Sequence, residues 1–400
     1  MKKILLLGGS AQQVIAIETA KRLGYYTVLC DYLPDNPGQY KADKFYLVST
    51  TDKDAVLEVA KKENIDGVLA YASDPAAPTA AYVAEQLGLP GNPYESVCTL
   101  CDKGRFRDFL KANGFATPYA NHYSDLESLK ADTAKFKLPV IIKPVDSSGS
   151  KGATVLDSWD NVGEAFEYAI SFSRAKRVVA EEFIVKKHPY LIGGDIFVSD
   201  GKVILWGLLN CHRDENVNPL VPVGKSYPPK LGTDDMENVK NVLRELVDKL
   251  HISSGAMNVE LIIDRSDRVY LIDIGPRSGG NMIPDLLGYI FNTDIVEQTV
   301  LSAMGQNTNK TYDKGECFYA THNLHSDRNG IFSDVLFSEE IEKYIIKKCI
   351  YKKPGDEAEY FDYATKALGI VFMKFDSEEE MDDILDNISE SITIKLSEQR

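Results

Sequence analysis

The chain has 400 residues, with 60 Asp and Glu against 45 Lys and Arg, and its formal net charge of −15 argues against nucleic acid or an anionic membrane as a partner. Because this length exceeds what one simple core holds, we expect about two to three domains. Six scattered cysteines, no signal-like N-terminus and no apolar run that could cross a bilayer indicate a soluble, cytoplasmic protein, in which Cys98 and Cys101 are ordinary thiols.

Strands and helices alternate in the first part of the chain. The predicted strands cover 3–7, 26–31, 45–48 and 67–70, and the predicted helices cover 11–23, 54–63 and 78–87. Such alternation implies a doubly wound parallel sheet. Ligands of these sheets bind beyond the carboxyl ends of the strands, so Gly9, Asp31 and the turn 71–74 form a predicted substrate rim. The dinucleotide pattern G-x-G-x-x-G is absent after the first strand.

A lysine and a loop of small residues mark the next part of the chain. A single helix over 103–113 bridges two proline-marked breaks, and a capping box at 124–127 opens a helix that reaches about residue 136. A short apolar strand then ends at Lys143. The alternative to a phosphate site here is an ordinary strand and turn, but lysine followed by free backbone N–H groups favours phosphate. The predicted phosphate loop, a mobile lid with little apolar surface, consists of Ser147, Ser148, Gly149, Ser150, Lys151 and Gly152.

Antiparallel pairing is expected to replace parallel pairing in the following segment. A helix over 161–173 precedes a buried strand over 178–180 that runs into 181–184. Asp200-Gly201 is a hairpin turn between strands at 195–199 and 203–209. After a helix over 233–251, a second hairpin joins strands over 256–264 and 268–275.

Two carboxylates face each other across this second hairpin. A short polar turn would place Asp264 opposite Val269 and Glu260 opposite Asp273. Facing like charges are unfavourable unless a cation lies between them, and their apolar neighbours argue against the alternative of two solvated carboxylates. The pair therefore predicts a divalent metal site. Arg277 follows in a glycine-rich turn and suits bidentate binding of phosphate or carboxylate.

The rest of the chain predicts a small α+β domain. The expected elements are a helix over 293–304, a linker over 306–310, strands over 317–321, 344–351 and 369–375, a helix over 378–387 and a strand over 391–396. The segments 212–213 and 322–325 contain histidines that we interpret as polar surface residues.

In order and spacing, these motifs resemble the ATP-grasp superfamily, whose members activate a carboxylate with ATP and couple it to an amine or similar nucleophile. The resemblance implies an N-terminal α/β domain over 1–98, an ATP-grasp domain over 99–305 with subdomains 114–180 and 181–305, and a C-terminal α+β domain over 306–400. It also implies ATP and Mg²⁺, with Mn²⁺ as an alternative metal, and small-molecule carboxylate and amine substrates.

The resemblance assigns roles to individual residues. Glu260 and Asp273 would bind the metal, and Arg277 and Lys143 would be catalytic. This chain departs from the common Glu-x-Asn-x-Arg pattern, because Asp273 is one carbon shorter and Gly275 replaces the asparagine, a role that Asn281 could take. The residues expected to hold the phosphates, adenine or ribose of ATP, besides the phosphate loop, are Lys103, Lys143, Glu181, Glu182, Phe183, Ile184 and Asp195.

The residue chemistry agrees with this mechanism. Triphosphate and a substrate carboxylate repel each other, so transfer requires lysines, an arginine and magnesium to neutralise and align them. Oxygen ligands favour magnesium over zinc. Within the superfamily the turn 277–284 looks most like amino-acid ligases, with phosphoribosylglycinamide synthetase and the ATP-dependent purine carboxylase subunit as alternatives. A non-catalytic ATP-binding regulator is an alternative of another class, and the oligomeric state stays open, a homodimer included.

Overall fold

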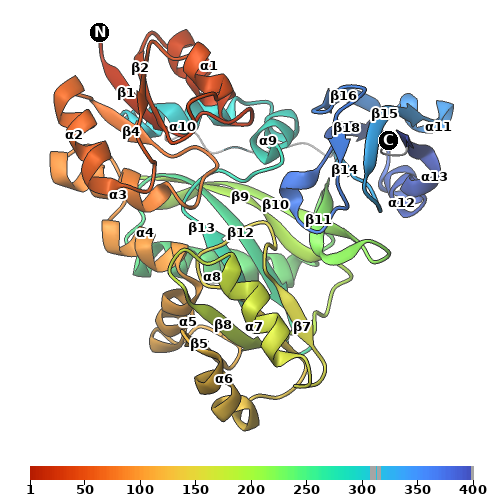
Figure 1. Cartoon of the computed structure of the whole chain (residues 1–400). Coiled ribbons are helices and arrows are strands. Elements are labelled where there is room, and N and C mark those ends of the chain that lie inside the picture. Colours follow the sequence, from red (N-terminus) through yellow and green to blue (C-terminus); the bar gives the residue numbers. More distant parts are fainter. Residues whose placement is uncertain (307–311, 313–316, 398–400) are drawn as a thin grey trace.

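The structure is a computed structural model that describes residues 1–306, 312 and 317–397, so nearly all of the predicted linker over 306–310 lies outside the described residues. Its N-terminal part confirms the doubly wound parallel sheet, with strand order β3-β2-β1-β4 (Figure 1). None of the described helices is both long and apolar enough to cross a membrane. The elements of this part are β1 (Lys3–Leu7), α1 (Val14–Arg22), β2 (Tyr26–Asp31), β3 (Lys44–Leu47), α2 (Lys53–Glu63), β4 (Gly67–Leu69) and α3 (Ala77–Leu87).

The segment after this sheet differs from its prediction in two places. The predicted helix over 103–113 is α5 (Lys103–Ala112), but a helix that was not predicted, α4 (Tyr94–Cys101), precedes it and ends at the extended backbone of Asp102. The N-cap of α6 (Leu126–Asp132) is Asp125, not Ser124, because the carboxylate of Asp125 accepts the amide of Ser128 at 2.8 Å. The antiparallel sheet that follows, in the order β5-β8-β6-β7, consists of β5 (Ala120–Tyr123), β6 (Val140–Pro144), β7 (Thr154–Leu156) and β8 (Val178–Glu182), with α7 (Val162–Ser171) packed on it.

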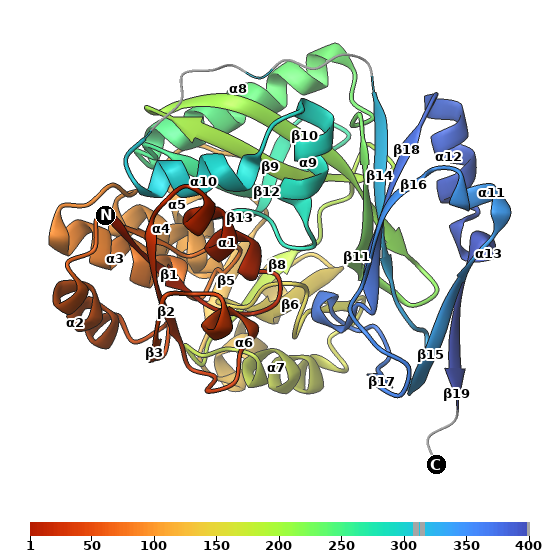
Figure 2. The ribbon, with the colours of Figure 1, turned by 90° about the horizontal axis from the view of Figure 1, so that it is seen from above.

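One large antiparallel sheet joins the rest of the chain, in the order β13-β12-β9-β10-β11-β14-β18-β16. Its pairing of β11 with β14 carries it across the predicted boundary at residue 305, and Figure 2 shows these two strands side by side. The sequence prediction missed β11, which follows the first hairpin. The strands are β9 (Leu191–Ser199), β10 (Lys202–Asp214), β11 (Asn218–Tyr227), β12 (Gly255–Ile263), β13 (Val269–Gly275), β14 (Phe318–Leu324), β16 (Ile345–Ile350) and β18 (Gly369–Phe375).

Helices cover both faces of this sheet. One face packs on α8 (Thr233–Lys249) and α5, where Leu243 and Phe106 contribute to the core. The other face is partly covered by α9 (Ile283–Phe291), which the prediction missed, while α10 (Ile295–Ala303) packs against the N-terminal sheet. The remaining C-terminal elements are β15 (Gly330–Phe337), α11 (Glu339–Glu342), β17 (Glu357–Ala358), α12 (Glu378–Asp386), α13 (Ile388–Ser391) and β19 (Ile392–Ser397), of which β15 and β17 were not predicted.

The register of the β12–β13 hairpin corrects one predicted pair and keeps the other. Ile263, not Asp264, pairs with Val269, which is a shift of one residue. A bulge at Ile272 then inserts one extra residue into β13 and restores Glu260 opposite Asp273. The predicted carboxylate pair therefore exists, although the count that led to it was off by one at the turn.

A buried arginine holds this bulge in place. Arg107 on α5 donates to the carbonyl oxygens of Leu271 at 3.0 Å and Ile272 at 2.7 Å, and its Nε donates to Glu181 at 2.7 Å. Glu181 also binds Lys143, and all three side chains are buried. Burial would raise the pKa of Glu181, but Arg107 and Lys143 outweigh it and hold this pKa at about 2. The Arg107–Glu181–Lys143 triad thus connects α5, β8, β6 and β13.

We predict that Arg107→Met destabilises the fold by about 3 to 5 kcal/mol, because it leaves Glu181 with one buried cation and frees two carbonyls. The matched control is Arg105→Met on the same helix, since Arg105 forms a surface ion pair with Glu95 and its loss should cost less than about 1 kcal/mol. Urea unfolding of both variants measures the difference. A change below that of the control would contradict the structural role of the triad.

Candidate active site

The predicted metal pair lies on the sheet face that α8 does not cover. Side chains alternate along β12, so Val259 and Leu261 enter the core beneath α8 while Asn258 and Glu260 point to the opposite face. The Asp273 side chain is 37% exposed and lies opposite Glu260. Two carboxylates therefore converge at an accessible point of an otherwise buried strand pair.

A lysine on another element, α5, reaches this point. The Nζ of Lys103, the first residue of α5, lies 3.2 Å from both carboxylate oxygens of Asp273 and donates to the Ser147 carbonyl at 3.0 Å. Burial lowers the pKa of Lys103, but Asp273 and Asp74 outweigh it and keep the pKa above its ordinary value. Lys143 lies on β6, held by Glu181, and burial lowers its pKa. The structure thus brings Lys103 to the phosphate loop and the metal pair.

Arg277 meets the predicted substrate rim. Its Nε and a terminal nitrogen donate to Asp74 at 2.8 and 2.5 Å. Burial would raise the pKa of Asp74, but Arg277 outweighs it and lowers this pKa. The other rim carboxylate, Asp31, accepts the amides of Gly9 and Leu33 at 2.7 and 2.9 Å and so shapes the N-terminal turn. Among the predicted rim residues, Asp74 of the turn 71–74 is therefore the one that contacts Arg277.

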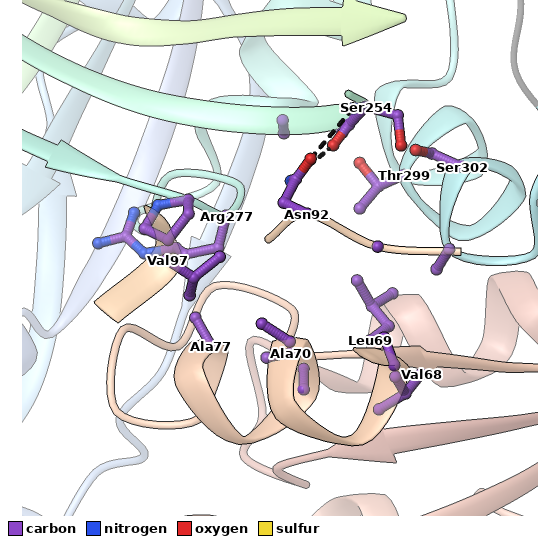
Figure 3. Close-up of a pocket in the computed structure, with 18 of the residues that line it drawn as sticks. Val68, Leu69, Ala70, Ala77, Asn92, Val97, Ser254, Arg277, Thr299 and Ser302 are labelled. Atoms are coloured by element: carbon purple, nitrogen blue, oxygen red, sulfur yellow. Dashed lines mark hydrogen bonds between the residues drawn. The ribbon is translucent and has the colours of Figure 1, made fainter. Parts of the chain in front are cut away.

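A cavity of about 100 Å³ lies between the N-terminal part and the large sheet, with Arg277 in its lining. Figure 3 shows Asn92 bonded to Ser254 at its edge, Ala70 and Leu69 on one side and Thr299 and Ser302 on the other. The lining is mostly small and apolar. The cavity thus lies between the two parts of the molecule, and Arg277 forms part of its wall.

Asp195 has partners of its own in the structure. Its buried carboxylate accepts the amide of Gly279 at 2.8 and 3.0 Å and the side-chain amide of Asn258 at 2.9 Å. Burial raises the pKa of Asp195 to about 6. It therefore anchors the glycine-rich turn after Arg277, in which Asn281 and Met282 have left-handed backbones. Its predicted ribose contact stays a prediction.

The phosphate loop touches the far end of the large sheet and the C-terminal part. The Ser150 hydroxyl donates to the Leu220 carbonyl at 2.8 Å, and the Lys151 ammonium lies 5.1 Å from the centre of the Tyr363 ring. The Lys103 ammonium also binds the Ser147 carbonyl, and the amide of Ala364 donates to the Gly149 carbonyl at 3.4 Å. The loop therefore spans from β6 to β11, and its predicted mobility stays a prediction.

The predicted adenine segment leaves one backbone donor open. The amides of Glu182 and Phe183 donate to the carbonyls of Tyr119 and Pro139, both at 2.9 Å, whereas the amide of Ile184 donates to no other residue that the structure describes. Phe183 is exposed. The side chain of Glu181 belongs to the triad, so among the described residues of this segment the amide of Ile184 is the backbone donor left open for a base.

The carboxylates present suit magnesium. Glu260 and Asp273 form a pair, and no group of three His, Cys, Asp or Glu side chains among the described residues could enclose a metal. Magnesium is typically bound by one or two carboxylates and completed by phosphates and water, whereas structural zinc needs four protein ligands.

The histidines interpreted as surface residues are instead partly buried: burial lowers the pKa of His212 to about 4 and that of His322 to about 3.

Sequence reasoning missed Arg107 and the role of Asp74. Arg107 lies one helical turn after Lys103, on the same face of α5, and this i, i+4 spacing was a usable signal. Asp74 was placed in the rim, but its pairing with Arg277 depends on how the N-terminal sheet docks, which no local pattern specifies. Both residues pair through long-range contacts.

Comparisons with known proteins agree with this geometry. A model of the ATP-grasp domain matches residues 100–281, and one of the ATP-grasp N-terminal domain matches residues 17–91. A formate-dependent phosphoribosylglycinamide formyltransferase from Parasynechococcus marenigrum is 31% identical over 189 residues, 46% of this chain and 48% of that protein, so the match spans about half the length of this relative.

Two solved structures have the same fold over the whole length. An L-amino acid ligase from Bacillus licheniformis has a TM-score of 0.82 at 19% identity, with 99% of both chains covered. A phosphoribosylglycinamide synthetase from Anaerococcus prevotii has a TM-score of 0.75 at 22% identity, covering 99% of this chain and 100% of that one. These structures share the fold of this chain, and the two domain matches identify the chain as a member of the ATP-grasp superfamily.

Proposed function

We propose that this protein is an ATP- and Mg²⁺-dependent ligase that activates a small-molecule carboxylate as an acyl phosphate and couples it to an amine. The observation that carries the proposal is the Glu260–Asp273 pair, with Lys103 at 3.2 Å from Asp273. A chain with net charge −15 needs such a local set of cations to hold a triphosphate. Membership of the ATP-grasp superfamily supports the same reaction class.

Each site residue has a defined part in this reaction. Glu260 and Asp273 would hold magnesium, which neutralises phosphate charge when bound. Lys103 would bind phosphate oxygens in exchange for Asp273, and Lys143 would stay with Glu181 and use its remaining N–H donors for a phosphate. Arg277 would stabilise the charge that develops at the transferred phosphoryl group, and the open amide of Ile184 would bind the adenine edge.

Two substrate classes compete for the acid and the amine. The likeness to an L-amino acid ligase over the whole chain agrees with amino-acid substrates. The sequence similarity to a formate-dependent phosphoribosylglycinamide formyltransferase favours formate with a phosphoribosyl amine. Both classes present a carboxylate to the same metal pair, so they differ only in what occupies the rest of the cleft.

The substrate prediction is tested by phosphate release from MgATP across amino acids, singly and in pairs, with formate plus phosphoribosylglycinamide and phosphoribosylamine plus glycine beside them. We expect ADP formation that depends on both an acid and an amine, because the acyl phosphate must be captured by a nucleophile. Activity confined to a phosphoribosyl substrate would overturn the amino-acid assignment, and ADP formation without acceptor dependence would refute the ligase.

The metal prediction concerns Glu260→Gln. Loss of one of the two carboxylates should reduce Mg²⁺-dependent turnover by at least about 100-fold, while the fold stays intact because a facing like charge is removed. Glu245→Gln on the outer helix α8 is the control and should leave turnover unchanged. Turnover of Glu260→Gln that follows the wild-type magnesium dependence would rule out the site.

The lid prediction concerns trypsin cleavage after Lys151. Since the small residues of the phosphate loop offer little apolar surface for packing, the ligand-free protein should be cut there, and MgATP analogues that resist hydrolysis should protect it. Cleavage after Lys202, at the exposed β9–β10 turn, provides an internal reference that the nucleotide should not change. Equal rates after Lys151 with and without nucleotide would count against a lid.

A further inference from the structure

One buried lysine near the metal pair forms no ion pair with any residue that the structure describes. Lys225, in the middle of β11, is 6% exposed, and its Nζ donates only to the Sγ of Cys211, at 2.7 Å. A thiol is a weak acceptor. Within residues 1–306, 312 and 317–397, no carboxylate lies at ion-pair distance from Lys225. A buried ammonium in this state is costly unless an anion joins it.

The ammonium points along the sheet toward Glu260. A Cβ added to Gly193 on β9 would lie 3.0 Å from Lys225 Nζ and 2.6 Å from Cys211 Sγ. Gly193 pairs directly with Glu260 on β12. Opposed side chains of paired strands lie about 5 Å apart at Cβ, so the Lys225 ammonium occupies the place of the side chain next to Glu260. Glycine at 193 is what keeps this space open.

A second cation, Arg213, has a buried nitrogen that is unbonded among the described residues. Arg213 is two residues beyond Cys211 on β10, so both side chains point to the same side of the sheet. Its NH1 is buried and makes no hydrogen bond to any described residue. The phosphate loop reaches this end of the sheet, where Ser150 bonds Leu220 on β11.

The contrast with the other cations of the cleft indicates what this pair binds. Lys103, Lys143 and Arg277 each have a carboxylate partner in Asp273, Glu181 and Asp74. Those three are therefore neutralised before any ligand arrives. Lys225 is therefore the cation at this point that can take up the charge of a ligand, and it lies on the side of β10 and β11, while Arg213 follows farther along β10, opposite Pro222.

We propose that Lys225, assisted by Arg213, binds an oxyanion of the non-nucleotide substrate over Gly193, beside the metal pair. The oxyanion is a carboxylate or a phosphate, two groups that an ammonium and a guanidinium bind in the same way. This inference rests on the proposed ligase function, because it places the non-nucleotide substrate beside Glu260 and Asp273, where its carboxylate would accept the phosphoryl group. It assigns Lys225 to substrate binding rather than to packing.

The test compares Lys225→Met with Cys211→Ser. The methionine variant should raise the KM of the non-nucleotide substrate about 10- to 100-fold and change the KM of ATP by less than about twofold, since one charge-assisted bond is lost. Its melting temperature should equal or exceed that of the wild type, because an unpaired buried charge is removed. Cys211→Ser touches the same lysine, keeps its charge and an acceptor, and should leave both KM values near the wild type.

Substrate analogues identify the oxyanion. The analogue in which the substrate carboxylate is replaced by its amide and the analogue without phosphate are used as competitive inhibitors, and the one that lacks the bound group should inhibit the wild type and Lys225→Met equally. Arg213→Gln, at a half-buried position, provides a second variant that should raise the same KM. A lower melting temperature with equal losses for ATP and substrate, or an unchanged substrate KM in both variants, overturns the proposal. Absence of ATP turnover in the wild type with every substrate would instead refute the ligase function itself.

Discussion

The buried triad of Arg107, Glu181 and Lys143 is the interaction on which the site depends. Arg107 donates to two carbonyls of the bulge on β13 and to Glu181 on β8, and Glu181 in turn binds Lys143 on β6. A single arginine therefore connects the sheet of β6 and β8 with the large antiparallel sheet. The bulge sets the register that places Asp273 opposite Glu260. Because buried charges tolerate little change of geometry, the position of the metal pair is fixed by the same residues that orient Lys143.

The cleft is built as a set of ion pairs. Asp74 neutralises Arg277, Asp273 neutralises Lys103 and Glu181 neutralises Lys143, so an acidic protein holds several cations in one place without strong repulsion. A polyanionic ligand would bind these paired cations rather than meet a bare positive surface. The cost of breaking the old pairs lowers affinity but discriminates against simple anions that bring too little charge to replace them.

Local patterns predicted the elements whose signal is contained in one segment. The strand before Lys143, the glycine-rich loop and the Asp200-Gly201 turn are such cases, because apolar runs and turn residues act over a few positions. The Glu260–Asp273 pair was predicted correctly although Asp264 was misplaced, since no sequence signal marked the bulge at Ile272. The triad, the Asp74–Arg277 pair and the placement of Lys225 over Gly193 arise from contacts between distant segments, which neither periodicity nor capping residues encode.

The pairing of β11 with β14 makes the C-terminal part a continuation of the large antiparallel sheet instead of an appended module. Backbone hydrogen bonds form this junction, and Gly224 permits its close approach, because a Cβ there would lie 2.4 Å from the Thr321 carbonyl oxygen. A graft that exchanged the C-terminal part for that of another family member would have to reproduce a strand ladder rather than a patch of side chains. Substitutions of side chains on either side of the junction should therefore be tolerated as long as Gly224 and the strand register are kept. A shift of β14 along its axis would move Lys225, because Lys225 pairs with Thr321 on that strand.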